Sequence, residues 1–442
     1  MAYDILKTIG NTPLYKFKKI GKENKNVEIY AKLEYFNPGG SVKDRAAYQM
    51  IADGEKLGKL TKDKIILEST SGNTGIALAV IGKLKGYKVK LFMPSNVSEE
   101  RKRIIKEFGA ELVFTDPLEG SDGAMIECQK EYEKHPEKYF KPDQYTNPSN
   151  SKSHFLGTGI EIWNQTKGKI THFVTGVGTG GTLIGTGRRL KHLSMDIKVI
   201  AIEPDYELHG LEGLKHMESS IMPKVYEQCY LDKKIRVKTE DAYEMVKRVA
   251  KEEGLFIGLS SGAAAFGALE VAKKLDKGIV VTVFPDNADR YISKGFWEDE
   301  YFGVFIKQAD LDKIAKHLKQ AYPNEGCGLL LGEIKNNRKF VKEVVEAENI
   351  VKERAVDRFE IDANEYKKID GYARKKGLDI IGVYHSHPDH PPRPSETDLK
   401  IAQPVLSYFI VSVYGGSVIA VKSYKLDENE KEFKEELVKP LN

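Results

Sequence analysis

Short apolar runs rich in β-branched residues alternate with amphipathic segments over the first two thirds of the chain. Residues 27–33 and 197–202 have the length and composition of buried strands. Residues 75–84 and 242–253 instead repeat their apolar positions at helical spacing. Strands that alternate with helices in this way predict an α/β fold with mostly parallel sheets.

This alternation ends after residues 286–290, and the aromatic and acidic stretch at residues 297–301 has no clear period. A chain of 442 residues is too long for one ordinary domain. We therefore expect two domains, residues 1–300 and residues 301–442.

The second predicted domain mixes helical and strand patterns without regular alternation. Asp362 and Glu365 have the spacing of a capping box at the start of a helix. Residues 378–384 and 408–414 have the composition of strands, and the charged residues 427–439 are expected to form a solvated tail. This mixture predicts an α+β domain.

Composition excludes several classes of protein. A formal net charge of +4 is close to balance, so neither a nucleic-acid partner nor a membrane surface is indicated. The three cysteines lie far apart in the sequence, which excludes a disulfide scaffold. No signal peptide and no apolar run of membrane-spanning length is visible, so we expect a cytoplasmic protein.

The first candidate for chemistry is Lys43, within Asn-Pro-Gly-Gly-Ser-Val-Lys-Asp-Arg at residues 37–45. Two glycines and a proline predict a tight turn, and Lys43 follows the turn where a helix begins. An ammonium group there faces the positive end of the helix dipole, so it should lose its proton more readily than a surface lysine. A neutral amine can form a Schiff base, whereas the alternative is an ordinary solvated lysine.

Three polar loops lie where a predicted strand gives way to a helix. Residues 175–182 would direct main-chain N–H groups at an anion such as phosphate. They also match G-x-G-x-x-G, and Glu203 ends the next strand, so this loop alone is equally compatible with a dinucleotide site. Residues 68–75 suit a carboxylate and residues 258–263 offer hydroxyl groups. Together with Lys43, these loops match a pyridoxal phosphate enzyme and not a hydride-transfer enzyme.

With these motifs in this order, residues 5 to about 295 resemble cysteine synthase. This family comprises the O-acetylserine and O-phosphoserine sulfhydrylases and shares its fold with cystathionine β-synthase. The resemblance implies a fold type II pyridoxal phosphate enzyme with two α/β subdomains, and a homodimer. It is carried by residues 9–14, 37–45, 70–75, 178–182 and 260–263.

The same resemblance implies a role for each matching residue. Lys43 becomes the Schiff-base lysine, Asn73 the partner of the cofactor's ring hydroxyl, and Ser260 the partner of its pyridine nitrogen. The implied phosphate loop is Gly178, Thr179, Gly180, Gly181 and Thr182. The residues implied to hold the carboxylate of the amino-acid substrate are Thr70, Ser71, Thr74 and Gln144.

The implied reaction is β-replacement on a serine derivative, either O-phosphoserine or O-acetylserine. Lys43 removes the α-proton, the β-substituent leaves, and a sulfur nucleophile adds at the β-carbon. Residues 210–217 resemble the segment in which O-phosphoserine-using members carry a basic phosphate contact. Lys215 is therefore a candidate phosphate ligand, and an ordinary exposed lysine is the alternative.

A second candidate site follows the apolar run at residues 380–384, where His385 and His387 are two residues apart. In a strand such residues point to the same side, so both imidazoles can reach one metal ion. Ser395 and Asp398 complete the pattern His-x-His-x7-Ser-x-x-Asp. Two histidines and one carboxylate leave the fourth position of zinc open, as in hydrolytic sites, whereas the alternative is surface histidines.

This pattern resembles the JAMM (MPN-type) metalloprotease family over residues 303–442. The resemblance implies Glu325 as general base and Ser395 as an oxyanion contact. The family cleaves amide bonds after the C-terminal tails of ubiquitin-like proteins, and the chain contains no ubiquitin-like segment, so such a partner must be a separate protein. The zinc ligands that the resemblance implies are His385, His387 and Asp398.

Joined in one chain, the two resemblances imply a shared substrate. Small ubiquitin-like sulfur carriers end in a glycine that can be thiocarboxylated. After sulfur transfer and a shift from sulfur to nitrogen, cysteine would be amide-linked to the carrier, and the zinc site would release it. The alternatives are a sulfide-dependent cysteine synthase, a cystathionine β-synthase, and a C-terminal domain that only docks a ubiquitin-like protein.

Overall fold

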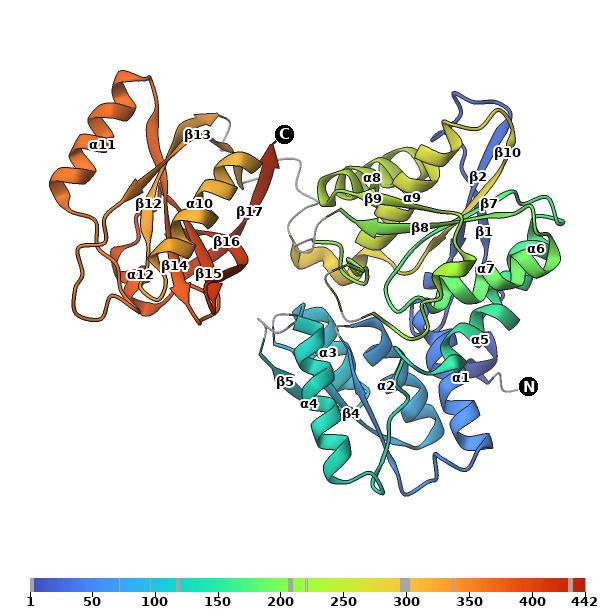
Figure 1. The fold of residues 1–442 in the computed structure, drawn as a ribbon. Coiled ribbons are helices and arrows are strands. Elements are labelled where there is room, and N and C mark those ends of the chain that lie inside the picture. The colour runs from blue at the N-terminus through green and yellow to red at the C-terminus, as the bar shows by residue number, and fades with distance from the viewer. Residues whose placement is uncertain are drawn as a thin grey trace. The chain divides into compact units, whose positions relative to one another are not determined.

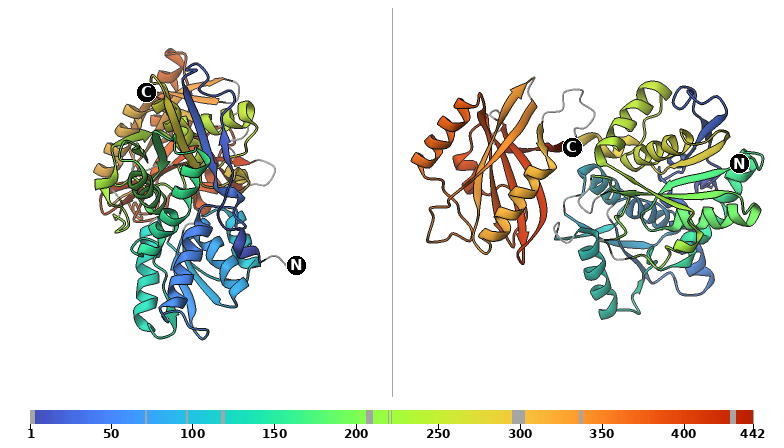
Figure 2. Two further views of the ribbon diagram at one scale, coloured as in Figure 1. Left: turned by 90° about the vertical axis from the view of Figure 1, so that its right-hand side faces the viewer. Right: turned by 45° about the horizontal axis from the view of Figure 1, so that its top comes forward.

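A computed structural model describes residues 4–70, 72–95, 97–116, 120–205, 210–218, 220, 222–294, 303–335, 338–427 and 432–441. The chain forms two compact units, Met1–Trp297 and Glu298–Asn442 (Figure 1, Figure 2). The domain boundary expected at residue 300 lies outside the described residues.

The first unit contains a six-stranded sheet in the order β1-β2-β10-β7-β8-β9. β1 is antiparallel to β2, and the other neighbours are parallel. The strands are β1 (Leu14–Lys16), β2 (Val27–Leu33), β7 (His172–Gly176), β8 (Lys198–Pro204), β9 (Lys233–Val237) and β10 (Gly278–Phe284). The helices of this subdomain are α5 (Pro148–Leu156), α6 (Thr158–Gln165), α7 (Gly181–Leu193), α8 (Thr239–Glu253) and α9 (Leu259–Ala272).

A second sheet of the first unit has the order β5-β4-β3-β6 with parallel pairing throughout. Both faces are covered, because Ile66 packs with Ile76 of α2 while its neighbour Leu67 packs with Cys128 of α4. The strands are β3 (Ile65–Ser69), β4 (Lys88–Pro94), β5 (Glu111–Thr115) and β6 (Tyr139–Phe140). The helices are α1 (Lys43–Lys56), α2 (Asn73–Lys85), α3 (Glu99–Glu107) and α4 (Gly120–Lys134).

The second unit is a closed sheet in the order β11-β13-β12-β14-β15-β16-β17. Leu330 packs with Ile314 of α10, and the adjacent Leu329 packs with Ile369 of α11, so helices cover both faces of β12. The strands are β11 (Gly303–Lys307), β12 (Cys327–Lys335), β13 (Arg338–Ala347), β14 (Asp379–Pro388), β15 (Ser407–Tyr414), β16 (Ser417–Asp427) and β17 (Glu432–Leu441). The helices are α10 (Gln308–Ala321), α11 (Ala363–Lys375) and α12 (Glu396–Ile401).

The predicted fold class is confirmed: two α/β subdomains with mostly parallel sheets precede an α+β unit. Asp362 caps α11, because its side chain accepts a hydrogen bond of 3.1 Å from the main-chain N–H of Glu365. Only this half of the predicted capping box is seen: the Glu365 carboxylate accepts a hydrogen bond of 3.3 Å from the N–H of Glu348. Four 3₁₀ helices complete the described elements: η1 (Ile5–Thr8), η2 (Glu34–Phe36), η3 (Gln228–Tyr230) and η4 (Ala288–Lys294). In the part of the chain that the structure describes, no helix is long and apolar enough to cross a membrane.

The expectation of a solvated tail at residues 427–439 is wrong. Most of this segment forms β17, which pairs antiparallel with β16 and parallel with β11. The ring of Phe433 lies 5.2 Å from that of Tyr408 and 6.3 Å from that of Tyr424, measured between centroids. Main-chain pairing and this aromatic contact stabilise a strand that its charged composition concealed.

Candidate active sites

Helix α1 begins at Lys43, directly after the predicted turn. Gly40 in this turn has φ +76°, a conformation that favours glycine, and a Cβ atom there would displace the guanidinium group of Arg290. Burial lowers the pKa of Lys43 to about 8, although the negative charge of Asp286 opposes this shift. Burial is therefore a second reason, besides the helix dipole, for Lys43 to lose its proton and react as a neutral amine.

One cavity of the first unit brings together most of the residues predicted for cofactor and substrate. Thr70, predicted to hold the substrate carboxylate, is not one of the residues that line it. The Thr70 hydroxyl instead accepts hydrogen bonds from the main-chain N–H groups of Gly72 (3.0 Å) and Gly75 (3.2 Å) within its own loop. Ser71 lies outside the described residues. The predicted residues that line the cavity are Lys43, Asn73, Thr74, Gln144, Gly178, Thr179, Gly180, Gly181, Thr182, Lys215 and Ser260.

The loop between β7 and α7 forms a cradle with room for an anion. A Cβ atom at Gly178 would collide with the carbonyl oxygen of Gly213, and one at Gly181 would collide with the side chain of Asn150. The packing of this loop therefore requires glycine at both positions, and the start of α7, where main-chain N–H groups lack partners within the helix, lies at the cavity. A phosphate group fits this set of donors, and pyridoxal phosphate needs such a site for its phosphate.

Thr74 and Gln144, both predicted to hold the substrate carboxylate, contact each other. The hydroxyl of Thr74 donates a hydrogen bond of 2.7 Å to the side-chain oxygen of Gln144. Asn150, which sequence reasoning missed, donates from its amide nitrogen to the carbonyl oxygen of Gln144 (2.7 Å) and to the hydroxyl of Thr179 (2.9 Å). Asn150 therefore links the predicted substrate contacts to the predicted phosphate loop.

Two further residues at Asn73 were missed from the sequence. Asp286 accepts a hydrogen bond of 2.7 Å from the amide nitrogen of Asn73. Arg290 donates to the side-chain oxygen of Asn73 and to the carbonyl oxygen of Gly39. The available signal was the polar run 286–290 directly after an apolar strand, which we interpreted only as the end of a domain.

Lys215 lines the cavity and is only 9% exposed, so it is not an ordinary surface lysine. Its amine lies 3.1 Å from a carboxylate oxygen of Asp122 and 5.2 Å from the centre of the Tyr145 ring. Its role as a phosphate contact stays a prediction.

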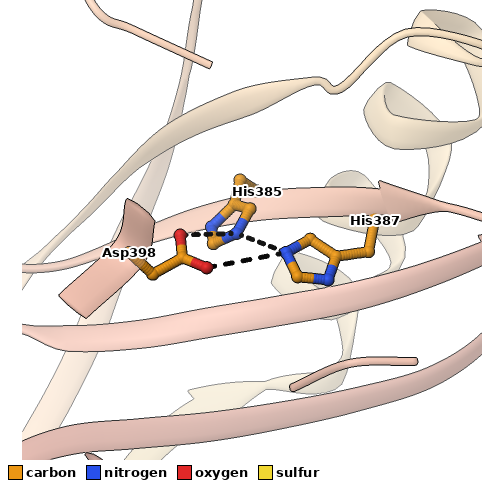
Figure 3. A group of neighbouring side chains, drawn as sticks. All are labelled: His385, His387 and Asp398. Atoms are coloured by element: carbon orange, nitrogen blue, oxygen red, sulfur yellow. Dashed lines mark hydrogen bonds and ion pairs between the residues drawn. The ribbon is translucent and has the colours of Figure 1, made fainter. Parts of the chain in front are cut away.

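In the second unit, His385, His387 and Asp398 place one ligand atom each within 4.8 Å of one another (Figure 3). Nε2 of His385 lies 3.1 Å from Nε2 of His387 and 3.2 Å from a carboxylate oxygen of Asp398. Nδ1 of His387 lies 3.0 Å from the carbonyl oxygen of Pro391, which orients the ring and leaves Nε2 for a metal. Burial lowers the pKa of both histidines and so favours their neutral form. This donor set fits zinc.

Glu325 lies two residues before Cys327, which pairs with His385 across β12 and β14. Burial raises the pKa of Glu325 to about 8, and the negative charge of Asp398 adds to the shift. Ser395 caps α12: its hydroxyl donates to the Asp398 carboxylate (2.7 Å) and accepts from the Asp398 N–H (3.1 Å). Ser395 therefore orients Asp398, and its role as an oxyanion contact stays a prediction.

Residues 5–286 match the family of pyridoxal-phosphate dependent enzymes. The chain belongs to this family. The cysteine synthase of Aquifex aeolicus (strain VF5) is 55% identical over 302 residues, which cover 67% of this chain and 92% of that relative. Cysteine synthase B of Salmonella typhimurium is 41% identical over 295 residues, which cover 67% of this chain and 96% of the relative.

The solved structures agree with these relatives. The cysteine synthase of Entamoeba histolytica has a TM-score of 0.65 at 39% identity, over 68% of this chain and 92% of that one. An O-acetylserine dependent cystathionine beta-synthase from Helicobacter pylori has a TM-score of 0.64 at 35% identity, over 67% of this chain and 99% of that one.

Residues 307–427 match the prokaryotic homologs of the JAB domain. Both resemblances inferred from the sequence are thereby confirmed. The comparisons support a pyridoxal-phosphate-dependent enzyme of cysteine synthase type, followed in the same chain by a JAB-type domain.

Proposed function

We propose that this pyridoxal phosphate enzyme makes cysteine on a protein carrier and then releases it. The first unit would exchange the β-substituent of O-phosphoserine or O-acetylserine for the sulfur of a thiocarboxylated ubiquitin-like carrier. The second unit would hydrolyse the resulting carrier–cysteine amide bond with zinc. The observation that supports this proposal is a three-residue metal-ligand set, His385, His387 and Asp398, in the same chain as a cysteine-synthase-type cavity.

Pyridoxal phosphate, when bound, supplies the electron sink for exchange at the β-carbon. The main chain of residues 178–182 would hold its phosphate, and the Lys43 amine would hold its carbonyl carbon and then take up the α-proton of the substrate. Thr74 and Gln144 would orient the substrate carboxylate. Ser260 would be a neutral partner for the pyridine nitrogen. A hydroxyl at this position makes the cofactor a weaker electron sink than a carboxylate would, and a weaker sink favours β-elimination over transamination.

The carrier chemistry balances with water as the only further reactant. The thiocarboxylate sulfur of the carrier forms a bond to the β-carbon of the serine derivative, the bond from that carbon to oxygen breaks, and acetate or phosphate leaves. The product is a thioester between the carrier's terminal carbonyl carbon and the cysteine sulfur. The cysteine amino group attacks that carbon, the sulfur leaves as a thiol, and an amide remains. Hydrolysis then adds one water across the amide and returns the carrier carboxylate and free cysteine.

Zinc at His385, His387 and Asp398 would supply a Lewis acid for this hydrolysis. Glu325 would take a proton from the attacking water and pass it to the departing amine. The hydroxyl of Ser395, held against Asp398, is the proposed contact for the oxyanion. As the resemblance to cysteine synthases implies, we also propose a homodimer, which light scattering on the purified protein would test.

The proposal is tested by comparing sulfur donors. The protein loaded with zinc and pyridoxal phosphate is given each serine derivative, with either sulfide or a recombinant ubiquitin-like carrier that ends in a Gly-Gly thiocarboxylate. Free cysteine made with the carrier as sulfur donor supports the proposal. If sulfide yields cysteine and the carrier yields none, the proposal is contradicted. The Lys43→Ala variant should make none from either donor, whereas Lys56→Ala, at the exposed end of the same helix, should behave like the wild type.

A further inference from the structure

Asp286 follows β10 and its side chain is fully buried. One carboxylate oxygen, Oδ2, accepts hydrogen bonds from the amide nitrogen of Asn73 (2.7 Å) and the hydroxyl of Tyr291 (2.6 Å). The other, Oδ1, has no hydrogen-bond partner among the described residues. A buried carboxylate with an unmatched oxygen is costly to fold, so its retention calls for a positive charge or a donor that completes the site.

The main chain at Asp286 also contacts the segments just before two other predicted cofactor residues, Lys43 and Ser260. Asp286 forms a β-bridge with Ser41, two residues before Lys43. Its carbonyl oxygen accepts a hydrogen bond of 3.1 Å from the N–H of Gly258, two residues before Ser260. A Cβ atom at Gly258 would collide with Oδ1, so glycine is needed there for the carboxylate to fit.

The partners of Asn73 determine which way its amide points. Its oxygen accepts from the Arg290 guanidinium, and its nitrogen donates to Asp286. An amide nitrogen has two hydrogens, so one remains to donate into the cavity that Asn73 lines. Without a carboxylate acceptor at position 286, the Asn73 amide could turn over, and its oxygen would then face the cavity as an acceptor.

The electrostatic surroundings point to Lys43 as the charge that Asp286 balances. The negative charge of Asp286 raises the pKa of Lys43 against the effect of burial. Arg290 directs its donors to Asn73 and Gly39. The charge of Asp286 also acts on Arg101, but the Arg101 guanidinium forms an ion pair with Glu212. Among the described residues, the other titratable groups whose charges act on Asp286 or Lys43 include Arg101, His154 and Tyr291. Arg290 contacts Asn73, which Asp286 also binds.

We propose that Asp286 is a positioning residue of the cofactor site. Its carboxylate fixes the Asn73 amide as a donor toward the ring oxygen of the cofactor. It also supplies the negative charge that keeps the Lys43 nitrogen protonated once this lysine has joined the cofactor. The inference rests on the proposed role of Lys43. It assigns a function to Asp286, which is not one of the residues predicted to contact the cofactor.

The test is the pH titration of the visible absorbance of the bound cofactor, which a merely structural residue would not shift. Asp286→Asn keeps the shape of the side chain and removes its charge. We expect the titration midpoint to fall by about one pH unit, as for the loss of a nearby opposite charge. Asp276→Asn removes an exposed acid just before β10 and should leave the midpoint unchanged.

An unchanged midpoint in an Asp286→Asn protein that retains its cofactor overturns the inference. If that variant does not fold, Tyr291→Phe provides a test with the opposite sign. Loss of the Tyr291 hydroxyl removes one donor from the carboxylate, so the midpoint should rise, and no rise contradicts the inference. A wild-type absorbance that Lys43→Ala leaves intact would instead overturn the proposed role of Lys43, and the inference with it.

Discussion

The hydroxyl of Thr74 donates a hydrogen bond of 2.7 Å to the side-chain oxygen of Gln144, 70 positions away in the sequence. Both residues line the same cavity as Lys43. The bond joins the start of α2 to the loop before α5, so a hydroxyl and an amide lie together on the wall of the cavity.

Thr74→Val should weaken binding of the serine derivative without loss of the cofactor. A hydrogen bond to a charged group contributes roughly 1.5–3 kcal/mol, so we expect KM to rise about 10- to 100-fold. Steady-state kinetics with O-acetylserine measures this, and the visible absorbance reports cofactor content. Thr61→Val alters an exposed threonine and serves as the control; an unchanged KM in Thr74→Val would contradict the assignment.

The attachment of pyridoxal phosphate to the apoprotein should follow the titration of Lys43. Its pKa is lowered from 10.5 to about 8 by burial, and only the neutral amine attacks a carbonyl carbon. The rate of attachment should therefore rise with pH through a midpoint near 8. Stopped-flow absorbance measures this rate, and a midpoint near 10.5 would show that Lys43 behaves as a surface lysine.

Lys215→Met should separate the two amino-acid substrates. The variant removes a cationic group from the cavity wall while it keeps most of the side-chain volume. We expect KM for O-phosphoserine to rise about tenfold or more, because a charge-assisted contact to phosphate is lost. KM for O-acetylserine should change by less than about twofold. Equal changes for both substrates would mean that Lys215 does not contact the phosphate.

Glu34→Gln should destabilise the first unit. Nε of Arg45 lies 2.6 Å from the buried Glu34 carboxylate, and Nη1 lies 2.6 Å from Glu161. Removal of one partner from a buried ion pair costs roughly 3–5 kcal/mol, and because Glu161 remains we expect about 3 kcal/mol. Urea unfolding followed by tryptophan fluorescence measures the loss, and a change below about 1 kcal/mol would contradict it.

Local patterns predicted much of this structure. Residues 27–33 form β2 with the expected bounds, because the alternate positions Val27, Ile29, Ala31 and Leu33 are buried and this local pattern is visible in the sequence. The loop at Gly178 and the turn at Gly40 were found for a similar reason. Close approach of the main chain requires glycine, and glycine is visible in the sequence.

Contacts between distant segments were not predictable in this way. The hydrogen bond between Asn73 and Asp286 joins residues 213 positions apart, and the sequence around either residue does not indicate that the two are in contact. The strand β17 was missed for the same reason. Its charged residues suggest a tail, and only pairing with β11 and β16 makes the segment a strand.

The central claim is that the second unit releases the cysteine that the first unit makes. His387→Ala removes one of three predicted zinc ligands, and His390→Ala removes a nearby exposed histidine outside that set. With a thiocarboxylated carrier as the only sulfur donor, His387→Ala should accumulate carrier bearing one amide-linked cysteine, visible by intact-protein mass spectrometry. His390→Ala should release free cysteine like the wild type. Free cysteine at the wild-type rate from His387→Ala would contradict the account.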